Sequence, residues 1–164
     1  MEAPIIAQWG PALWTLLHYL AERSGKTRPQ GRVNWAEEEK RLWRGFLIGL
    51  RLCIPCPMCR THYNTFYRDN RIDPLLQQED WGLSLRAWLW RFHNEVRTSK
   101  GQPLILSLED LGPTYASMGL EDYGKARQTL TEHLRRGLSM RMYVRDDMVK
   151  CLRFMEELRI CVES

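Results

Sequence analysis

Apolar side chains recur every three or four positions along most of this chain of 164 residues. The pattern predicts one helix from Pro11 to about Arg23, a second from Trp35 to about Leu52 with Asn34 as its cap, and another from about Leu83 to Ser99. Leu104-Ile105-Leu106 is a candidate for a short extended piece, but no stretch alternates apolar and polar residues over the length of a strand. The pattern therefore predicts an all-α fold.

A cluster of cysteines stands directly ahead of one more predicted helix. Cys53, Cys56 and Cys59 fall within seven residues. Pro57 suits the first position of a helix that runs to about Asn70, because its missing N–H group costs no hydrogen bond there. Cys56 is then at the N-cap and Cys59 in the first turn, where free N–H groups and the helix dipole favour a thiolate. This pair is suited to redox chemistry.

The same residues leave two other functions open. Zinc needs about four ligands, usually in two pairs, and His62 offers a third beside Cys56 and Cys59, but no second compact pair follows. An iron–sulfur run of this spacing needs its fourth cysteine where Tyr63 stands. A zinc- or iron-binding helical module is thus one alternative. A non-enzymatic helical adaptor, in which the cysteines only pack, is the other.

Composition limits which cell compartment and which classes of binding partner are expected. The net charge of +4 is modest and spread along the chain, which argues against a nucleic-acid-binding surface. Apolar stretches such as Phe46 to Leu50 are far shorter than the roughly 20 residues of a membrane span. Glu2, Pro4 and Pro11 interrupt the apolar N-terminus, so we expect no signal peptide and a cytoplasmic protein. Five cysteines in such a chain favour redox or metal chemistry over a disulfide scaffold.

Three separated motifs resemble the Erv/ALR family of FAD-linked sulfhydryl oxidases, in the style of its short members encoded by large DNA viruses. Trp9-Gly10-Pro11-Ala12-Leu13-Trp14-Thr15-Leu16-Leu17-His18 is similar to the first-helix signature of that family. Pro55 to Tyr63 resembles its redox Cys-x-x-Cys segment. Trp88 and His93-Asn94-Glu95-Val96 resemble its His-Asn-x-Val-Asn helix, and Gly101 with Pro103 matches the turn that follows. The motifs occur in the expected order over residues 9–103.

The resemblance implies a four-helix bundle with a short fifth helix over residues 1–107, which holds FAD and no metal ion and commonly forms a homodimer. The implied cofactor-binding residues are Trp9, Gly10, Trp14, His18, Cys59, His62, Tyr63, Phe66, Trp88, His93, Asn94, Val96 and Arg97. For His62 and Trp88, a role in core packing and a role in cofactor contact are equally favoured. Tyr63 and Phe66 are expected in the wall of the cofactor site or in the core. Arg97 is either a ligand of the FAD phosphates or a solvated arginine at a helix end.

The reaction that the resemblance implies begins at the cysteine pair. As a hypothesis, a substrate thiolate attacks Cys56, and Cys59 leaves and passes electrons to the flavin, which reduces O₂ to hydrogen peroxide. The expected substrate is a protein dithiol or a thioredoxin-like carrier.

Several positions depart from the family pattern. Arg97 replaces the final Asn of the His-Asn motif, Gln102 stands where a lysine is common, and Pro11 stands where arginine is frequent. A structural disulfide of many cellular relatives has no counterpart, because the regions that would hold it contain no cysteine.

Residues 108–164 lie outside the resemblance and form a predicted helical C-terminal extension. One helix is expected from Tyr115 to about Arg136 and a last one from Ser139, and we expect them to pack on the bundle or at a dimer interface. The last helix carries an apolar stripe of Val144, Met148, Cys151, Met155, Leu158 and Val162. Cys151 is expected to be buried, and Cys161 is either inert or a shuttle thiol toward Cys56.

Overall fold

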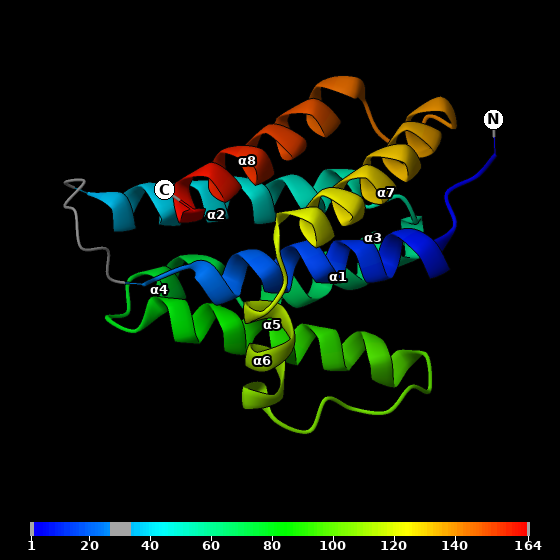
Figure 1. The fold of residues 1–164 in the computed structure, drawn as a ribbon. Coiled ribbons are helices and arrows are strands. Elements are labelled where there is room, and N and C mark those ends of the chain that lie inside the picture. Colours follow the sequence, from blue (N-terminus) through cyan, green and yellow to red (C-terminus); the bar gives the residue numbers. More distant parts are fainter. Residues whose placement is uncertain (1, 27–33, 164) are drawn as a thin grey trace.

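The computed structural model describes residues 2–26 and 34–163, and these residues form eight α-helices and one short 3-10 helix (Figure 1). The elements are α1 (Ile6–Arg23), α2 (Trp35–Cys53), α3 (Pro57–Asp69), α4 (Ile72–Leu76), α5 (Trp81–Ser99), η1 (Leu108–Asp110), α6 (Leu111–Ala116), α7 (Leu120–Ser139) and α8 (Arg145–Glu163). The described residues contain no strand, so the predicted all-α class is confirmed.

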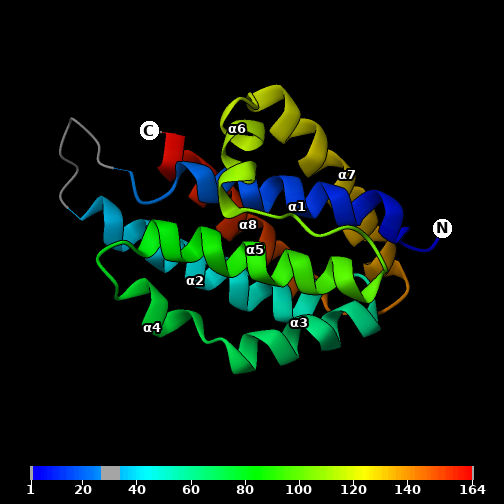
Figure 2. The ribbon, with the colours of Figure 1, turned by 90° about the horizontal axis from the view of Figure 1, so that it is seen from below.

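Four longer helices surround the core of the first part of the chain. α1, α2, α3 and α5 run roughly along one another, and the short α4 connects α3 to α5 (Figure 2). Their apolar faces meet around Trp43 and Trp88, which are both at most 1% exposed. The burial of these large side chains removes apolar surface from water, which is the main term that stabilises such a bundle.

The two C-terminal helices pack on this bundle. α7 lies along α1 and α8 lies along α2 (Figure 1). The stripe of α8 from Met148 to Val162 is buried and belongs to the same core as α1 and α2, and Cys151 is buried as expected. His133 of α7 also ties the extension to the start of α1, because its Nδ1 accepts the Ile5 N–H at 3.1 Å and its Nε2 lies 2.9 Å from the Gln8 amide oxygen.

The first predicted boundary is wrong, because α1 begins at Ile6 and contains Pro11. Proline within a helix removes the hydrogen bond to the carbonyl four residues earlier, here that of Ala7. Both Pro11 and Ala7 are exposed, so water can reach the freed carbonyl. This explains how α1 continues through the proline.

Other predicted boundaries also differ from the structure. Asn34 is the N-cap residue of α2 as predicted, but its backbone is left-handed (φ 70°) and its side chain makes no capping hydrogen bond. Asp73 and Pro74 lie in α4 rather than in an irregular connector, since proline is tolerated in the first turn of a helix. The last helix begins at Arg145 instead of Ser139, which leaves Val144 outside it and 61% exposed.

Glycines on α2 allow the close packing of α8. A Cβ atom on Gly49 would lie 3.1 Å from the Cys151 Cβ and 3.3 Å from its Cα, which are closer than ordinary carbon contacts. These atoms belong to the backbone or are fixed to it, so they cannot move aside without a shift of the whole helix. The glycine therefore sets the distance between α2 and α8 at this point.

We expect Gly49→Ala to lower the free energy of unfolding by about 1–3 kcal/mol, because the added methyl group overpacks the α2–α8 contact. Gly124→Ala on α7 is the matched control, since nothing lies within 4 Å of its added Cβ. The control should gain up to about 1 kcal/mol from helix propensity. Urea unfolding of both variants measures the difference, and equal changes would contradict the packing argument.

Candidate active site

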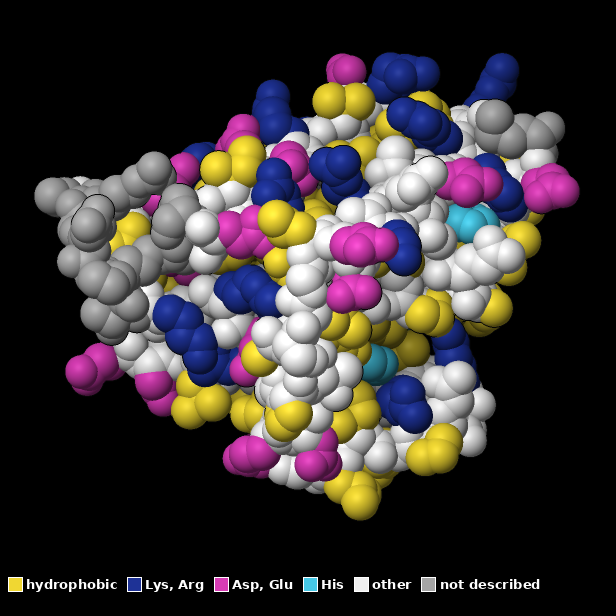
Figure 3. Space-filling view, viewed as in Figure 1, with side chains coloured by type: hydrophobic (Ala, Val, Ile, Leu, Met, Phe, Trp, Pro, Cys, Tyr) yellow, Lys and Arg dark blue, Asp and Glu magenta, His cyan; other side chains and the backbone are white. Residues whose placement is uncertain are grey.

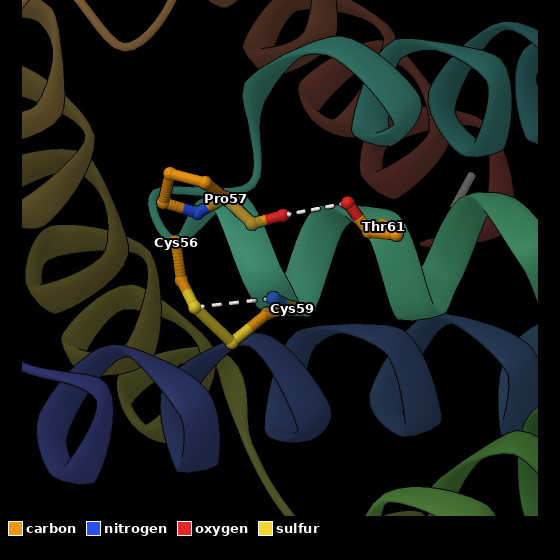
Figure 4. Close-up of a disulfide and its surroundings, with 4 residues drawn as sticks. All are labelled: Cys56, Pro57, Cys59 and Thr61. Carbon is orange, nitrogen blue, oxygen red and sulfur yellow. Dashed lines mark hydrogen bonds between the residues drawn. A yellow bond between two sulfur atoms is a disulfide. The ribbon is translucent and has the colours of Figure 1, made fainter.

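The cysteine pair lies at the start of α3. Cys56 and Cys59 are disulfide-bonded, with their Cα atoms 5.2 Å apart, and Pro57 is the first residue of the helix (Figure 4). Cys56 is the N-cap as predicted, and its Sγ accepts the Cys59 N–H at 3.2 Å. One free N–H group of the helix start is thus directed at the sulfur of Cys56, where it can stabilise a thiolate.

The next residue, Arg60, connects this helix start to the C-terminal extension. Its guanidinium donates to the carbonyl oxygens of Leu52, near the end of α2, and of Met142, in the turn between α7 and α8, both at 3.1 Å. The extension therefore contributes directly to the surroundings of the disulfide.

A largely apolar cavity of about 820 Å³ opens beside the disulfide. Such a volume and lining are typical of sites for small molecules and cofactors. The predicted residues on its wall are Trp9, Gly10, Trp14, Cys56, Cys59, His62 and Val96. Figure 3 shows, on the face viewed, a hollow with apolar side chains between α1 and α5. Helices α1, α3 and α5 thus bring residues from all three motifs to one cavity.

Two predicted histidines form a buried stack behind this wall. His18 Nε2 lies 2.8 Å from His93 Nδ1, and the His93 ring lies flat on Trp14 with the ring centres 3.9 Å apart. Burial, together with the neighbouring His93, lowers the pKa of His18 to about 3. Burial and the positive charges of Arg97 and Lys100 lower the pKa of His93 to about 4. Both rings are therefore neutral near pH 7, and one donates a hydrogen bond to the other.

Three predicted residues lie in the helical core, away from the cavity wall. Tyr63 donates to the Leu47 carbonyl at 2.6 Å, and Trp88 donates through Nε1 to the Asn70 carbonyl at 2.8 Å. The Phe66 ring packs against Trp88 at 5.0 Å between ring centres. Their polar atoms are satisfied within the chain. Of the two residues left open, His62 is thus on the cavity wall and Trp88 is in the core.

Asn94 and Arg97 hold the segment after α5. Asn94 makes two hydrogen bonds to the Ile105 backbone, donating at 3.0 Å and accepting at 2.8 Å. The Arg97 guanidinium donates to the Pro103 carbonyl. Neither side chain is on the cavity wall, so both fix the position of the loop that follows the helix.

Ten residues on the wall were not predicted as site residues, and Lys100 and Met142 are two of them. Lys100, at the end of α5, lines the cavity two positions before Gln102, where the resemblance led us to look for a lysine. Met142 lines it from the turn between α7 and α8. The sequence carries no signal for Met142, because this turn reaches the site only through tertiary packing.

One polar atom at the cavity has no partner within the part of the chain that the structure describes. The Nε1 of Trp9 is buried and donates no hydrogen bond there, although Trp9 lines the cavity. A buried donor without an acceptor costs free energy unless another molecule satisfies it. In residues 2–26 and 34–163, no three His, Cys, Asp or Glu side chains gather in a way that could hold a metal ion.

We expect the neutral His18–His93 pair to make folding weaker in acid. Because both pKa values are lowered in the folded chain, the unfolded chain binds protons first as the pH falls below about 6.5. Stability should therefore decline from about pH 6.5 through pH 4 and below, by a few kcal/mol at most. Urea unfolding at pH 6.5 and 4.5 measures the slope. The double variant His18→Gln and His93→Gln should show a clearly smaller slope than the wild type, and an unchanged slope would refute the assignment.

Comparisons with known proteins identify relatives of this chain. The model of the Erv1 / Alr family matches residues 11–109, which is more than half of the chain. A segment of 56 residues is 38% identical to a Frog virus 3 (isolate Goorha) protein named "Putative FAD-linked sulfhydryl oxidase 088R". This segment covers 34% of the chain and 34% of the viral protein, so the match spans about a third of that relative. No solved structure matches the chain.

A search of the described helices finds none that is long and apolar enough to cross a membrane. The family match covers the first-helix signature from Pro11 onward and the other two motifs in full, up to the turn after α5. The chain belongs to the Erv1/Alr family.

Proposed function

We propose that this chain is an FAD-dependent thiol oxidase that converts substrate dithiols into disulfides and delivers the electrons to O₂, which gives hydrogen peroxide. One observation carries the proposal: a disulfide at a helix start forms part of the wall of a large apolar cavity. Membership of the Erv1/Alr family supports it. When bound, FAD supplies the transfer of an electron pair from a dithiol to O₂, a step that thiols alone perform slowly.

The residues of the cavity fit FAD. The flat indole of Trp14 and the apolar side chains around it suit an aromatic ring system. The Trp9 Nε1, which has no acceptor among the described residues, offers a hydrogen bond to a ligand that carries acceptors. Lys100 supplies a positive charge at the wall, where the phosphates of the cofactor could be held. His18, His93, Asn94 and Arg97 would support the site by fixing α1, α5 and the loop after α5.

The positions of the two sulfurs support different roles. In Figure 4 the Cys59 sulfur lies toward α1, the helix that carries Trp9 and Trp14, whereas Cys56 is at the start of α3. We infer that a substrate thiolate attacks Cys56 and displaces Cys59 as a thiolate beside the cavity. When a second substrate thiol resolves the mixed disulfide, the Cys59 N–H can stabilise the departing Cys56 thiolate.

The surface beside the disulfide favours a protein dithiol or a thioredoxin-like carrier as the substrate. Met58, between the two cysteines, is 81% exposed and presents an apolar side chain to an approaching partner. We further propose that residues 1–107 form the oxidase unit, that residues 108–164 form its extension, and that the chain is a homodimer as is common in its family. Sedimentation equilibrium of the purified chain tests the last point.

Two cysteine variants test the order of the thiol reactions. Cys59→Ser should lose dithiothreitol-dependent oxygen consumption, because the displaced thiolate is gone. With glutathione disulfide it should still accumulate a mixed disulfide at Cys56, located by peptide mapping without reductant, because the released glutathione leaves no second thiol on the adduct to reverse the step. Cys56→Ser should lose both the turnover and the adduct. Equal trapping by both variants would contradict the assigned order.

The role of Lys100 is tested by cofactor binding. The purified chain should be yellow, with the absorption bands of bound flavin, whereas a metal module or an adaptor should show no flavin. Lys100→Ala should weaken FAD binding about 2–10-fold, as expected for the loss of one partly solvated charge contact. Lys125→Ala on α7 is the control, since this exposed lysine pairs with Glu121 away from the cavity. Titration of the apoprotein measures both, and equal affinities would exclude Lys100 from the site.

A further inference from the structure

Two cysteines that the proposed reaction does not use lie together in the core. Cys53 ends α2 and is fully buried, and Cys151 lies in α8 and is 2% exposed. The Cys53 Sγ is 3.2 Å from the Gly49 carbonyl oxygen, and a Cβ added to Gly49 would lie 3.2 Å from the Cys151 Sγ. Both sulfurs therefore lie against the same residue of α2. In the structure neither forms a disulfide.

The surroundings keep Cys151 as a thiol while α8 is in place. A hydrogen bond with Cys53 and burial raise the pKa of Cys151 well above its ordinary value. A thiolate is the reactive form in disulfide exchange. Cys151 is therefore unreactive once it is enclosed, so the attack by its thiolate must take place before α8 has fully packed against α2.

The active-site disulfide is the oxidant nearest to Cys53 along the chain. The spacing Cys53-x-x-Cys56 equals that of Cys56-x-x-Cys59, which is bonded in the structure. Between α2 and α3 the chain turns tightly, because the Cys56 N–H donates to the Ile54 carbonyl at 2.8 Å. The end of α2 is therefore held close to the start of α3.

We propose that Cys53 and Cys151 form a second disulfide, made by exchange with the Cys56–Cys59 disulfide, that joins the C-terminal extension covalently to the oxidase bundle. The exchange itself needs only the disulfide seen in the structure. Regeneration of the Cys56–Cys59 disulfide after the exchange rests on the proposed oxidase function.

The exchange is balanced within the chain. The Cys53 thiolate attacks the Cys56 sulfur, which breaks the Cys56–Cys59 bond and releases the Cys59 thiolate. The Cys151 thiolate then attacks the Cys53 sulfur, which forms the Cys53–Cys151 bond and releases the Cys56 thiolate. The protons lost by Cys53 and Cys151 are taken up by Cys56 and Cys59. One dithiol is oxidised, the other disulfide is reduced, and no further reactant is consumed.

Cys161 is not an alternative partner for Cys151. The two residues lie ten positions apart on α8, which corresponds to about 15 Å along a helix. That separation is far beyond the span of a disulfide. Cys161 therefore serves as an internal control in the experiments below.

Counting reactive thiols tests the proposal directly. The chain, purified in air, is denatured in excess N-ethylmaleimide and its intact mass is measured. With two disulfides, only Cys161 reacts and one adduct forms. Three adducts that peptide mapping places on Cys53, Cys151 and Cys161 would overturn the proposal, whereas three on Cys56, Cys59 and Cys161 would show one exchange without regeneration of the active-site disulfide. Cys161→Ser should show no adduct, and peptide mapping without reductant should yield the linked Cys53 and Cys151 peptides.

The source of the oxidising equivalents is tested with Cys59→Ser, which cannot form the active-site disulfide. In this variant all remaining cysteines should react with N-ethylmaleimide. Linked Cys53–Cys151 peptides at the wild-type level would overturn the exchange mechanism. Dithiothreitol-dependent oxygen consumption of the wild-type preparation separates the two proposals. If the preparation consumes oxygen but carries three adducts, only the proposal of a second disulfide is refuted. If the linked peptides are found but the preparation consumes no oxygen, only the proposed oxidase activity is refuted.

Thermal unfolding gives a readout on the folded protein. Since the Cys53–Cys151 bond would close a long loop, reductant should lower the midpoint of unfolding by on the order of 5–10 °C. The short Cys56–Cys59 loop contributes little to this difference. Cys151→Ser should lose most of the reductant effect and Cys161→Ser should keep it. An equal effect in both variants would contradict the covalent link.

Discussion

The start of α3 is the constraint on which the site depends. Pro57 fixes the first helical residue, and this places Cys56 just outside the helix and Cys59 within its first turn. The distance between them then suits a disulfide, and the Cys59 N–H reaches the Cys56 sulfur because an N-terminal turn has no carbonyl to pair with it. A shift of the helix start by one residue would remove both the distance that suits a disulfide and the hydrogen bond to the Cys56 sulfur. The other helices contribute to the chemistry because they form a cavity beside the start of α3.

The extension takes part in that placement. Met142 forms part of the cavity wall, and the Arg60 guanidinium joins its carbonyl to that of Leu52. Tyr115 of α6 packs on His18 at 4.8 Å between ring centres, which closes the buried histidine stack from the other side. Residues beyond the family match therefore contribute both to the cavity wall and to the packing of His18. The site belongs to the whole chain, although its motifs lie in the first two thirds.

The sequence was informative where one local rule decided the structure. Proline at a helix start and the spacing of apolar residues predicted α2, α3 and α5 to within a few residues, as well as the position of Cys56. Boundaries failed at Pro11 and Pro74, where solvent exposure or a place in the first turn made proline tolerable. For the site, the family resemblance predicted residues on the cavity wall and residues behind it without distinguishing the two groups. Burial separates them: Trp14 faces the cavity, while Tyr63 and Trp88 satisfy their polar atoms inside the chain. The place of Lys100 on the wall depends on where α5 ends, and that of Met142 depends on how a distant turn packs. No local sequence pattern contains this information.

The glycines of α2 have a consequence for shorter relatives. Gly45 and Gly49 leave a bare strip on α2 that Phe154 and Cys151 of α8 fill. A polypeptide that kept every motif up to the turn after α5 but lacked the last helices would expose this strip, together with the apolar residues beside it, to water. Exposed apolar surface of that kind promotes association. Variation in α2 and variation in α8 are therefore not independent, since any change in α8 alters how the second helix is covered.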